Sequence, residues 1–266
     1  IEIVEVKSIA TAFVALLFLA VYNKSLLKVK AKDLWCFGGT GILSLLLFNF
    51  FYFEAITLTS MSIAVSLLYT APVFVMIFSV FLFKEAVTKR KVIAIASSFL
   101  GCILVSGALM GTSQLTALGF IFGIGAGLCY ALYSVFSRFA LNKGYHPFTI
   151  TAYTFVFTSI GGAFFTDFSI VEQVYLQHKS EVFLNYFVLS VVITFIPYIL
   201  YTIGLVYIEN SKAAVMVSVE PAIATLLGFL IFSEIPSFLN FIGMILIISA
   251  VVILNIRRFK RLDLIS

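Results

Sequence analysis

Two acidic residues, Glu54 and Glu220, lie inside long apolar runs of this sequence, where a charge is unfavourable. Glu220 stands about eight residues into its run, roughly 12 Å deep and close to the middle of a ~30 Å apolar layer. No Lys, Arg or His near the middle of a run offers it a partner. An unpaired carboxylate at that depth takes up a proton or binds a cationic group such as an ammonium. An equally open interpretation is a protonated Glu220, hydrogen-bonded between helices.

Neighbouring residues extend this hypothesis. Pro221 has no backbone N–H, so the carbonyl of Val217 stays available beside Glu220.

Glu54 lies near the end of its run, where water reaches; an interfacial role is favoured, and ion coupling is the alternative. Glu85 and Glu234 each end a run, and we expect them to accept hydrogen bonds from the backbone amides that begin the next helix.

Tyrosines and one asparagine recur on single faces of several runs, which predicts a shared cavity. A tyrosine combines an apolar ring with a hydroxyl group, and therefore suits the orientation of a small amphipathic substrate. The alternative is that these hydroxyl groups only join one helix to another. Besides Glu220, the candidate substrate-binding residues are Asn49, Tyr52, Tyr69, Tyr130, Tyr133, Tyr198 and Tyr201.

Signals for other chemistry are weak. The three cysteines are scattered through apolar runs, as is typical of small buried hydrophobic residues, and both histidines lie outside the runs. Three glycines spaced four residues apart, from Gly119 to Gly127, favour close helix packing, and no phosphate-binding loop is present. The apolar runs contain no nucleophile–base pair, so we expect no enzyme, no cofactor and no metal site.

The composition requires lipid as the main solvent of the elements that carry these residues. The chain is 62% hydrophobic and 11% charged, whereas a soluble domain has about 25% charged residues. The net charge of +5 comes from short basic clusters between the runs, which indicates membrane orientation and not nucleic-acid binding. The predicted class is an all-α polytopic membrane protein whose partners are the lipid bilayer and a small-molecule substrate. Its oligomeric state is left open.

Runs of about 20 apolar residues predict nine transmembrane helices. The breaks between them are short; the longest, 167–181, has room for one surface helix. The predicted helices cover residues 8–22, 35–56, 62–83, 92–110, 116–137, 147–166, 182–207, 213–233 and 238–256.

Basic residues alternate between the loops and so predict an orientation. Lys and Arg follow the first, third, fifth, seventh and ninth runs. The other loops carry only Lys7 and Lys179 as basic residues, together with six acids: Glu2, Glu5, Asp167, Glu172, Glu181 and Glu234. Positive loops face the cytoplasm. We therefore expect a cell-membrane protein with a cytoplasmic C-terminus and with residue 1 on the outer side.

A repeat at an offset of 149 residues divides the chain. Because the two copies run in opposite directions through the membrane, each half should contain an odd number of helices. The second half shows five and the first shows four, which predicts a ten-helix inverted 5+5 repeat whose first helix precedes residue 1. The expected parts are 1–110, 116–256 and a basic tail at 257–266. Ala64, Pro72, Glu85 and Tyr52 recur as Ala213, Pro221, Glu234 and Tyr201.

These motifs resemble the EamA-type branch of the drug/metabolite transporter superfamily. The similarity covers essentially the whole chain and rests on the order of the motifs: Phe51-Tyr52-x-x-Ala55-Ile56, Ala64-x7-Pro72-Val73-x11-Lys84-Glu85, Ala131-x-Tyr133-x4-Arg138 and Glu220-Pro221-x12-Glu234. The resemblance implies ten helices, a central cavity between the halves, and export or uptake of small metabolites.

The predicted function is secondary transport of small metabolites such as amino acids or amines by alternating access. Transport would be driven by a proton or another gradient, or be passive, with Glu220 and Glu54 as the coupling candidates. Pro72, Pro197 and Pro221 are the expected hinge positions. The alternative is a non-transporting receptor or scaffold, which would pack its polar stripes tightly and leave no wet cavity.

Overall fold

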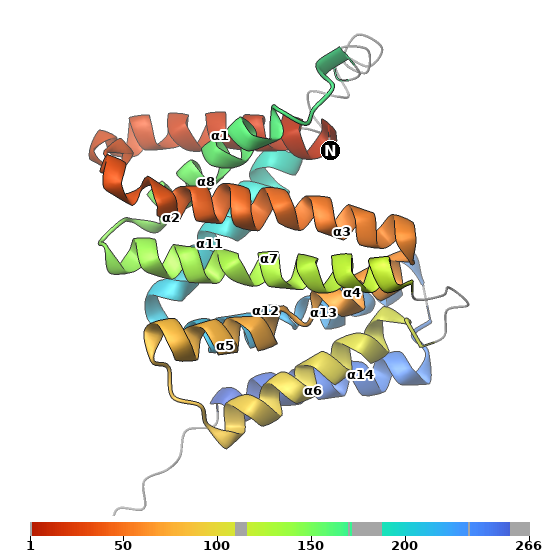
Figure 1. The fold of residues 1–266 in the computed structure, drawn as a ribbon. Helices are drawn as coiled ribbons and strands as arrows, with labels where there is room; N and C mark the ends of the chain where they lie inside the picture. The colour runs from red at the N-terminus through yellow and green to blue at the C-terminus, as the bar shows by residue number, and fades with distance from the viewer. Residues whose placement is uncertain (1, 110–115, 170, 172–187, 234, 256–266) are drawn as a thin grey trace, which may run out of the picture.

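The computed structural model describes residues 2–109, 116–169, 171, 188–233 and 235–255, and within them the chain is helical and contains no strand (Figure 1). His178, Lys179, Glu234, most of the loop 167–181 and the tail 257–266 lie outside these residues. The elements are α1 (Glu2–Tyr22), η1 (Lys24–Leu27), η2 (Ala31–Asp33), α2 (Leu34–Gly38), η3 (Gly39–Leu46), α3 (Leu47–Leu58), α4 (Met61–Leu68), α5 (Ala71–Phe83), α6 (Lys89–Ser106), α7 (Ala117–Asn142), α8 (Pro147–Gly162), η4 (Val191–Phe195), α11 (Ile196–Tyr207), α12 (Asn210–Val217), α13 (Glu220–Phe232) and α14 (Phe238–Asn255).

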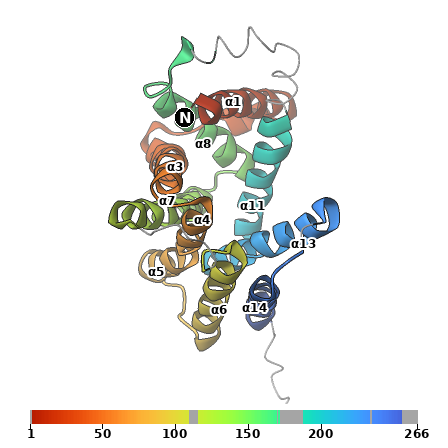
Figure 2. The same ribbon diagram turned by 90° about the vertical axis from the view of Figure 1, so that its right-hand side faces the viewer.

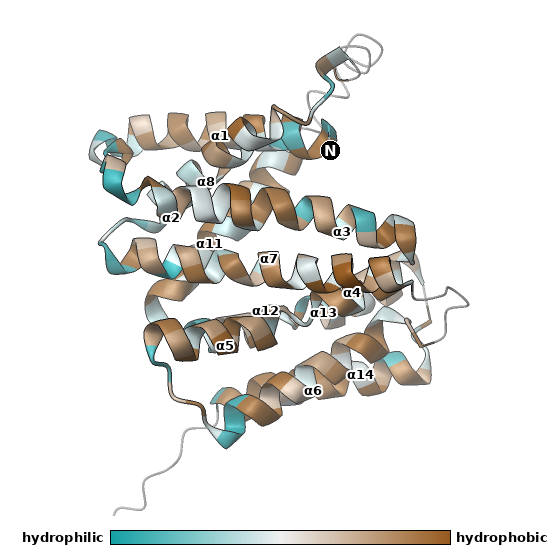
Figure 3. Ribbon diagram, in the orientation of Figure 1, coloured by the Kyte–Doolittle hydropathy of each residue, from teal (hydrophilic) through white to brown (hydrophobic). Residues whose placement is uncertain are grey.

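Seven helical segments of the described residues, some of them made of two successive helices, are long and apolar enough to cross a membrane. The other two of the nine predicted segments correspond to α6, whose first turn carries three basic residues, and to α8, which has 16 residues. Hydrophobic residues dominate the helices, and hydrophilic ones gather at their ends and in the connections (Figure 3). The seven segments are Glu2–Tyr22, Ala31–Leu58, Met61–Phe83, Ala117–Asn142, Val188–Tyr207, Asn210–Phe232 and Phe238–Asn255.

Several predicted boundaries differ from the structure, and two of them by the largest margin. Helix α1 begins at Glu2 and not at residue 8, and α7 continues to Asn142 and not only to residue 137. Both errors have one cause, because an apolar run stops at the first charged residue, whereas the backbone hydrogen bonds of a helix continue past it. As a consequence Glu5, which the sequence placed before the first helix, is inside α1 and buried.

The predicted runs 62–83 and 213–233 are each broken in the middle. Helix α4 ends before Tyr69 and α5 follows, and α12 ends before Ser218 and α13 follows. Pro72 and Pro221 lie in the first turn of the second helix of each pair, where the missing backbone N–H removes no hydrogen bond. The prolines therefore mark a break between two short helices and not a kink inside a long one.

The two broken segments belong to a larger equivalence in spacing. The bounds of α11, α12, α13 and α14 are those of α3, α4, α5 and α6 shifted by 149 residues. The π-helical segments η3 and η4 end one residue before α3 and α11, respectively. Lys84 and Ser233, also 149 apart, end α5 and α13 in the left-handed conformation, with φ of 56° and 57°.

Close helix contacts explain part of the arrangement. A Cβ on Gly123 of α7 would lie 2.4 Å from the Leu67 side chain of α4, so the predicted close approach at this glycine is confirmed. Gly101 of α6 faces Gly243 of α14, where a Cβ on either residue would meet the carbonyl oxygen of the other. Side chains larger than hydrogen would push these helix pairs apart.

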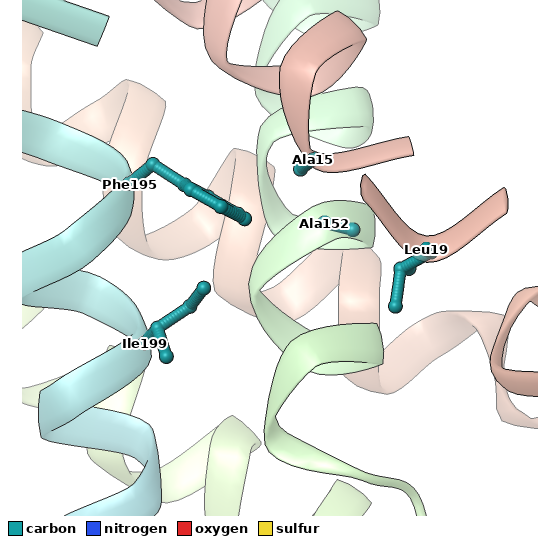
Figure 4. Close-up of a cluster of buried hydrophobic side chains, with 5 residues drawn as sticks. All are labelled: Ala15, Leu19, Ala152, Phe195 and Ile199. Atoms are coloured by element: carbon teal, nitrogen blue, oxygen red, sulfur yellow. The ribbon is translucent and has the colours of Figure 1, made fainter. Parts of the chain in front are cut away.

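Helices α1, α8 and α11 meet at one side of the bundle. Ala15 and Leu19 of α1, Ala152 of α8, Phe195 at the end of η4 and Ile199 of α11 form one buried cluster (Figure 4). Seen along the helices, α3, α4, α5 and α7 lie together, with α11 and α13 on the other side (Figure 2). The candidate functional site lies between these two groups.

Candidate functional site

A cavity of about 490 Å³ lies between the two groups of helices. Both helix breaks open onto it, so its wall includes residues of the α4–α5 junction and of the α12–α13 junction. It is lined by Ser44, Leu45, Phe48, Tyr52, Val65, Leu68, Tyr69, Ala71, Pro72, Val75, Tyr130, Tyr133, Ser134, Ile193, Pro197, Tyr198, Tyr201, Ala214, Val217, Ser218 and Glu220.

Glu220 is the only acidic or basic residue among these lining residues. It is the first residue of α13 and its side chain is exposed, in keeping with a position on the cavity wall. The expected location eight residues into a continuous helix was therefore wrong, because the helix ends and restarts at this point. A carboxylate in the first turn of a helix also interacts favourably with the free backbone N–H groups there.

All six candidate tyrosines line the cavity, but their hydroxyl groups have two different environments. The hydroxyl of Tyr133 lies 2.8 Å from Oγ1 of Thr202, and that of Tyr201 lies 2.5 Å from Oγ of Ser134. These two bonds join α7 to α11. For Tyr133 and Tyr201, the alternative of hydroxyl groups that connect helices is present in the structure.

The hydroxyl groups of the other four tyrosines make no hydrogen bond within the described residues. Phe48 organises two of them, because its ring stacks on Tyr52 at 5.6 Å between centroids and meets Tyr130 edge-on at 5.5 Å. Tyr198 packs edge-on against Tyr133 at 5.1 Å. The cavity therefore presents aromatic walls and hydroxyl groups that can bond a ligand. The four are Tyr52, Tyr69, Tyr130 and Tyr198.

Three predicted residues do not line this cavity. The side-chain amide of Asn49 donates to the Leu45 carbonyl at 2.7 Å, one turn earlier in its own helical segment. Glu54 is half-buried on α3, away from the cavity lining. Pro221 lines a neighbouring cavity, whereas Pro72 and Pro197 line the central one.

A polar network joins helices at one end of the bundle, which we call the basic end: there α1, α5 and α7 end and α6, α8 and α12 begin. Oε1 of Glu85 accepts a hydrogen bond of 2.9 Å from the backbone N–H of Asn210, and Oε2 accepts from Ser211 Oγ at 2.5 Å. Glu85 was expected to bond the amides of the next helix, α6. That expectation was wrong, because Thr88 caps α6 and Glu85 reaches across to α12.

Two cations complete this network. The ammonium group of Lys91 lies 3.2 Å from Glu85 and 2.8 Å from Glu209. Arg138 donates from Nε to the side chain of Asn210 at 2.7 Å and from Nη2 to the carbonyl of Ile208. The Asn210 amide donates in turn to the carbonyl of Ser134, next to the cavity, at 3.0 Å. We call Glu85, Lys91, Arg138, Glu209, Asn210 and Ser211 the Glu85 network.

The other end of the bundle, which we call the opposite end, is where α1, α4 and α7 begin. A second cavity of about 660 Å³ lies there, lined by residues at the start of α4, the end of α6, the middle of α13 and the start of α14. It shares Val65 with the central cavity, and Pro221 in its wall follows Glu220 directly in the chain. The central cavity is therefore adjacent to this second cavity, while the basic end contains the Glu85 network and a separate cavity of about 600 Å³ with Arg138 in its wall.

Several residues of the site were not identified from the sequence. Ser44, Phe48 and Ser218 line the cavity, and Thr202 holds Tyr133, yet none was a candidate. Ser44 lies in the π-helical segment η3, whose altered period disrupts the usual 3.6-residue face. Phe48 lies four residues before Tyr52, on the same face, and that spacing is the signal that could have found it.

Comparison with known proteins agrees with this fold. The sequence model described as the EamA-like transporter family matches residues 1–107 and again 117–256. A solved crystal structure superposes with a TM-score of 0.76 over 96% of this chain and 86% of that chain. At 18% identity this likeness concerns the fold alone.

Sequence relatives point the same way. An uncharacterised transporter of Archaeoglobus fulgidus is 32% identical over 216 residues, which are 80% of this chain and 75% of the relative. The uncharacterised transporter YxxF of Bacillus subtilis is 27% identical over 80% of this chain and 68% of its own length. The resemblance predicted from the motifs is confirmed: the chain belongs to the EamA-like transporter family of membrane proteins.

Proposed function

We propose that this protein is a secondary carrier that moves a small metabolite bearing an amino group, such as an amino acid or an amine, by alternating access. The observation that carries the proposal is Glu220, a lone carboxylate on the wall of a cavity whose other lining residues are uncharged. Such a carboxylate attracts an ammonium group, and the aromatic side chains around it favour a cation further.

The size of the cavity supports a small substrate. A volume of about 490 Å³ lies within the range of small-molecule sites, roughly 300–1,000 Å³. Hydroxyl groups of Tyr52, Tyr69, Tyr130 and Tyr198 would orient the polar part of the ligand, while the aromatic rings bury its apolar part. A tightly packed receptor or scaffold would leave no such space, so the cavity favours a carrier over that alternative.

The same carboxylate provides a route to coupling. One Glu220 side chain can be neutralised either by a proton or by a bound ammonium group, so the two ligands compete for it. Release of the substrate would then be favoured by a proton arriving from the same side. This competition would link substrate movement to a proton gradient.

An inverted repeat of the two halves would provide the movement. Support comes from the identical spacing of four helix pairs and from the basic loops at one end, which by the positive-inside rule would be cytoplasmic. The halves would rock about the helix breaks next to Pro72 and Pro221 and about Pro197, beside η4. With the Glu85 network at the cytoplasmic end and the second cavity at the outer end, this conformation would face outward.

Flux measurements in proteoliposomes test the proposal. The full-length protein is assayed with a labelled panel of amino acids and amines, with and without an imposed pH gradient. We expect saturable, pH-dependent flux of one compound, and a loss of about 10- to 100-fold in Glu220→Gln, since one charge-assisted contact is removed. Glu54→Gln is the matched control and should keep its flux. Unchanged flux and unchanged pH dependence in Glu220→Gln would refute the proposed role of this carboxylate.

A further inference from the structure

A second carboxyl group is buried in the helices away from the cavity. Glu5 of α1 is 1% exposed, and neither of its carboxylate oxygens has a hydrogen-bond partner among the described residues. Ser8, one turn further along the same face, is fully buried and its hydroxyl also lacks a partner there. By contrast Thr11, the next residue on this face, donates to the carbonyl of Lys7 at 2.7 Å.

The described helices next to Glu5 bring no positive charge to it. A Cβ at Gly162, the last residue of α8, would collide with Oε2 of Glu5, so the carboxylate lies directly against the end of that helix. The elements α8 and η4, which pack on α1, contain no acidic or basic residue, and neither does η3, whose Leu46 also lies against Gly162. The charged residues that flank Glu5 in the sequence are Glu2 and Lys7, and the charged residue that follows Gly162 is Asp167.

Position and burial together select a cation. An ionised carboxylate that is removed from water without a partner is unstable unless a positive charge neutralises it. Glu5 lies against the last residue of α8, where the helix dipole is negative, and this strengthens that preference. The two carboxylate oxygens of Glu5 and the hydroxyl of Ser8, one turn further along α1, are oxygen ligands of the kind that suit a hard cation.

We propose that Glu5 and Ser8, at the C-terminal end of α8, form a site for one monovalent cation, H⁺ or Na⁺, that is distinct from Glu220. Neither residue lines the central cavity. The site is nevertheless close to it, because Leu46 of η3 also lies against Gly162, and the preceding residues Ser44 and Leu45 line the cavity wall. A cation here would stabilise the contact of α1 with the end of α8, next to η3. It would therefore affect the position of the cavity-wall residues that η3 carries.

Carbodiimide labelling of the full-length protein in lipid vesicles tests this site without any transport assay. The apolar reagent dicyclohexylcarbodiimide enters the bilayer and reacts with protonated carboxyl groups, and mass spectrometry reads each modified peptide separately. In choline buffer at neutral pH, we expect Glu5 to react at least about tenfold faster than Glu209, which ion pairs keep ionised. The reaction of Glu5 should slow as the pH rises.

Sodium distinguishes the two cations. If Na⁺ binds, replacing choline by Na⁺ at ten times its dissociation constant should slow the labelling of Glu5 about tenfold. Ser8→Ala should weaken that protection and leave the labelling in choline unchanged. If Na⁺ has no effect while labelling still falls with rising pH, the ligand is the proton alone.

The site is refuted if Glu5 reacts no faster than Glu209 at neutral pH and if Na⁺ leaves the labelling rate of Glu5 unchanged. Glu220 lies on a different peptide, so its labelling reports on the proposed substrate site independently. The two proposals can therefore fail separately.

Discussion

The two ends of the bundle are formed by helices with the same spacing along the chain but with different side chains. At the basic end Lys91, Asn210 and Ser211 all belong to the Glu85 network. Residues 149 positions away in the repeat are Asn240, Met61 and Ser62, and all three line the second cavity at the opposite end. Glu234, which stands 149 residues after Glu85, lies outside the described residues.

This difference has a simple chemical origin. Asn210 uses its backbone N–H and both ends of its side-chain amide to bind Glu85, Arg138 and Ser134, whereas Met61 can make none of the side-chain bonds. Asn240 donates instead to the carbonyl of Val105 at 2.9 Å, within its own side of the cavity. Hydrogen bonds thus join the end of α5 to α12 at the basic end, whereas the residues 149 positions away line a cavity. A carrier that alternates would have to break the Glu85 network to open the basic end.

Removing Glu85 should have the largest effect on this comparison. Glu85→Ala leaves the buried ammonium of Lys91 with Glu209 alone and leaves the Asn210 N–H unpaired, so we expect the closed basic end to lose about 3 kcal/mol. The measurement is thiol labelling of Ser134→Cys from the basic side, in a variant without the three natural cysteines. Labelling should rise in Glu85→Ala and stay low in Glu54→Ala. Equal labelling of both variants would show that the network does not close this end.

Asn210→Ala should have a smaller effect on the same end. It removes the hydrogen bonds to Arg138 and Ser134 and keeps the backbone bond to Glu85, so we expect a loss of about 1–2 kcal/mol. The same thiol assay reads the result. Asn49→Ala, whose amide bonds only its own helical segment, is the matched control.

Placing an asparagine at the opposite end should have the smallest of these stabilising or destabilising effects. Met61→Asn places at the start of α4 the residue type that stands at the start of α12. We expect a stabilisation of the closed opposite end of less than about 1 kcal/mol, since a single new hydrogen bond contributes no more. Labelling of Ser62→Cys should slow slightly. If it becomes faster, the asparagine has no closing effect in this position.

We expect that a change of pH near neutrality does not open the Glu85 network. Burial raises the pKa of the Glu209 carboxyl, the ammonium groups of Lys91 and Lys212 lower it, and the net direction is downward from 4.5. Because the pKa of Glu209 is lowered in the closed state, its ionised carboxylate stabilises that state at any pH above the ordinary pKa. This stabilisation is lost only as the pH falls from the ordinary pKa toward the lowered one. Labelling of Ser134→Cys should therefore stay constant between about pH 5.5 and 8. A change within that window would assign the pH response of the carrier to the Glu85 network.

The sequence predicted the class, the family and most of the polar residues in the cavity wall. Glu220 and six tyrosines were found because polar residues in apolar helices stand out, and their facing positions follow from the 3.6-residue period. The break before Glu220 was not found, since Ser218 and Val219 continue the apolar run without a turn signal. The Glu85 network was missed for a different reason: it joins residues 125 positions apart, and only the packed fold brings Glu85 to Asn210.

Glu5 illustrates the limit of reading apolar runs. Its charge moved the predicted helix start to residue 8, although the buried positions of α1 follow one helical face: Val4, Glu5, Ser8, Thr11, Ala12, Ala15 and Leu19. Extending that period backward would have placed Glu5 inside the helix. It would not have revealed the contact with Gly162, which depends on how α8 ends.

Distances measured at both ends of one molecule test the central claim most directly. Spin labels at Lys84 and Lys212 report on the basic end, and labels at Met61 and Thr225 report on the opposite end. In the wild type we expect a short distance at the basic end and a long one at the opposite end. In Glu85→Ala the first should lengthen and the second should shorten together, as rocking of two halves requires. A basic end that opens while the opposite end keeps its distance would contradict the account.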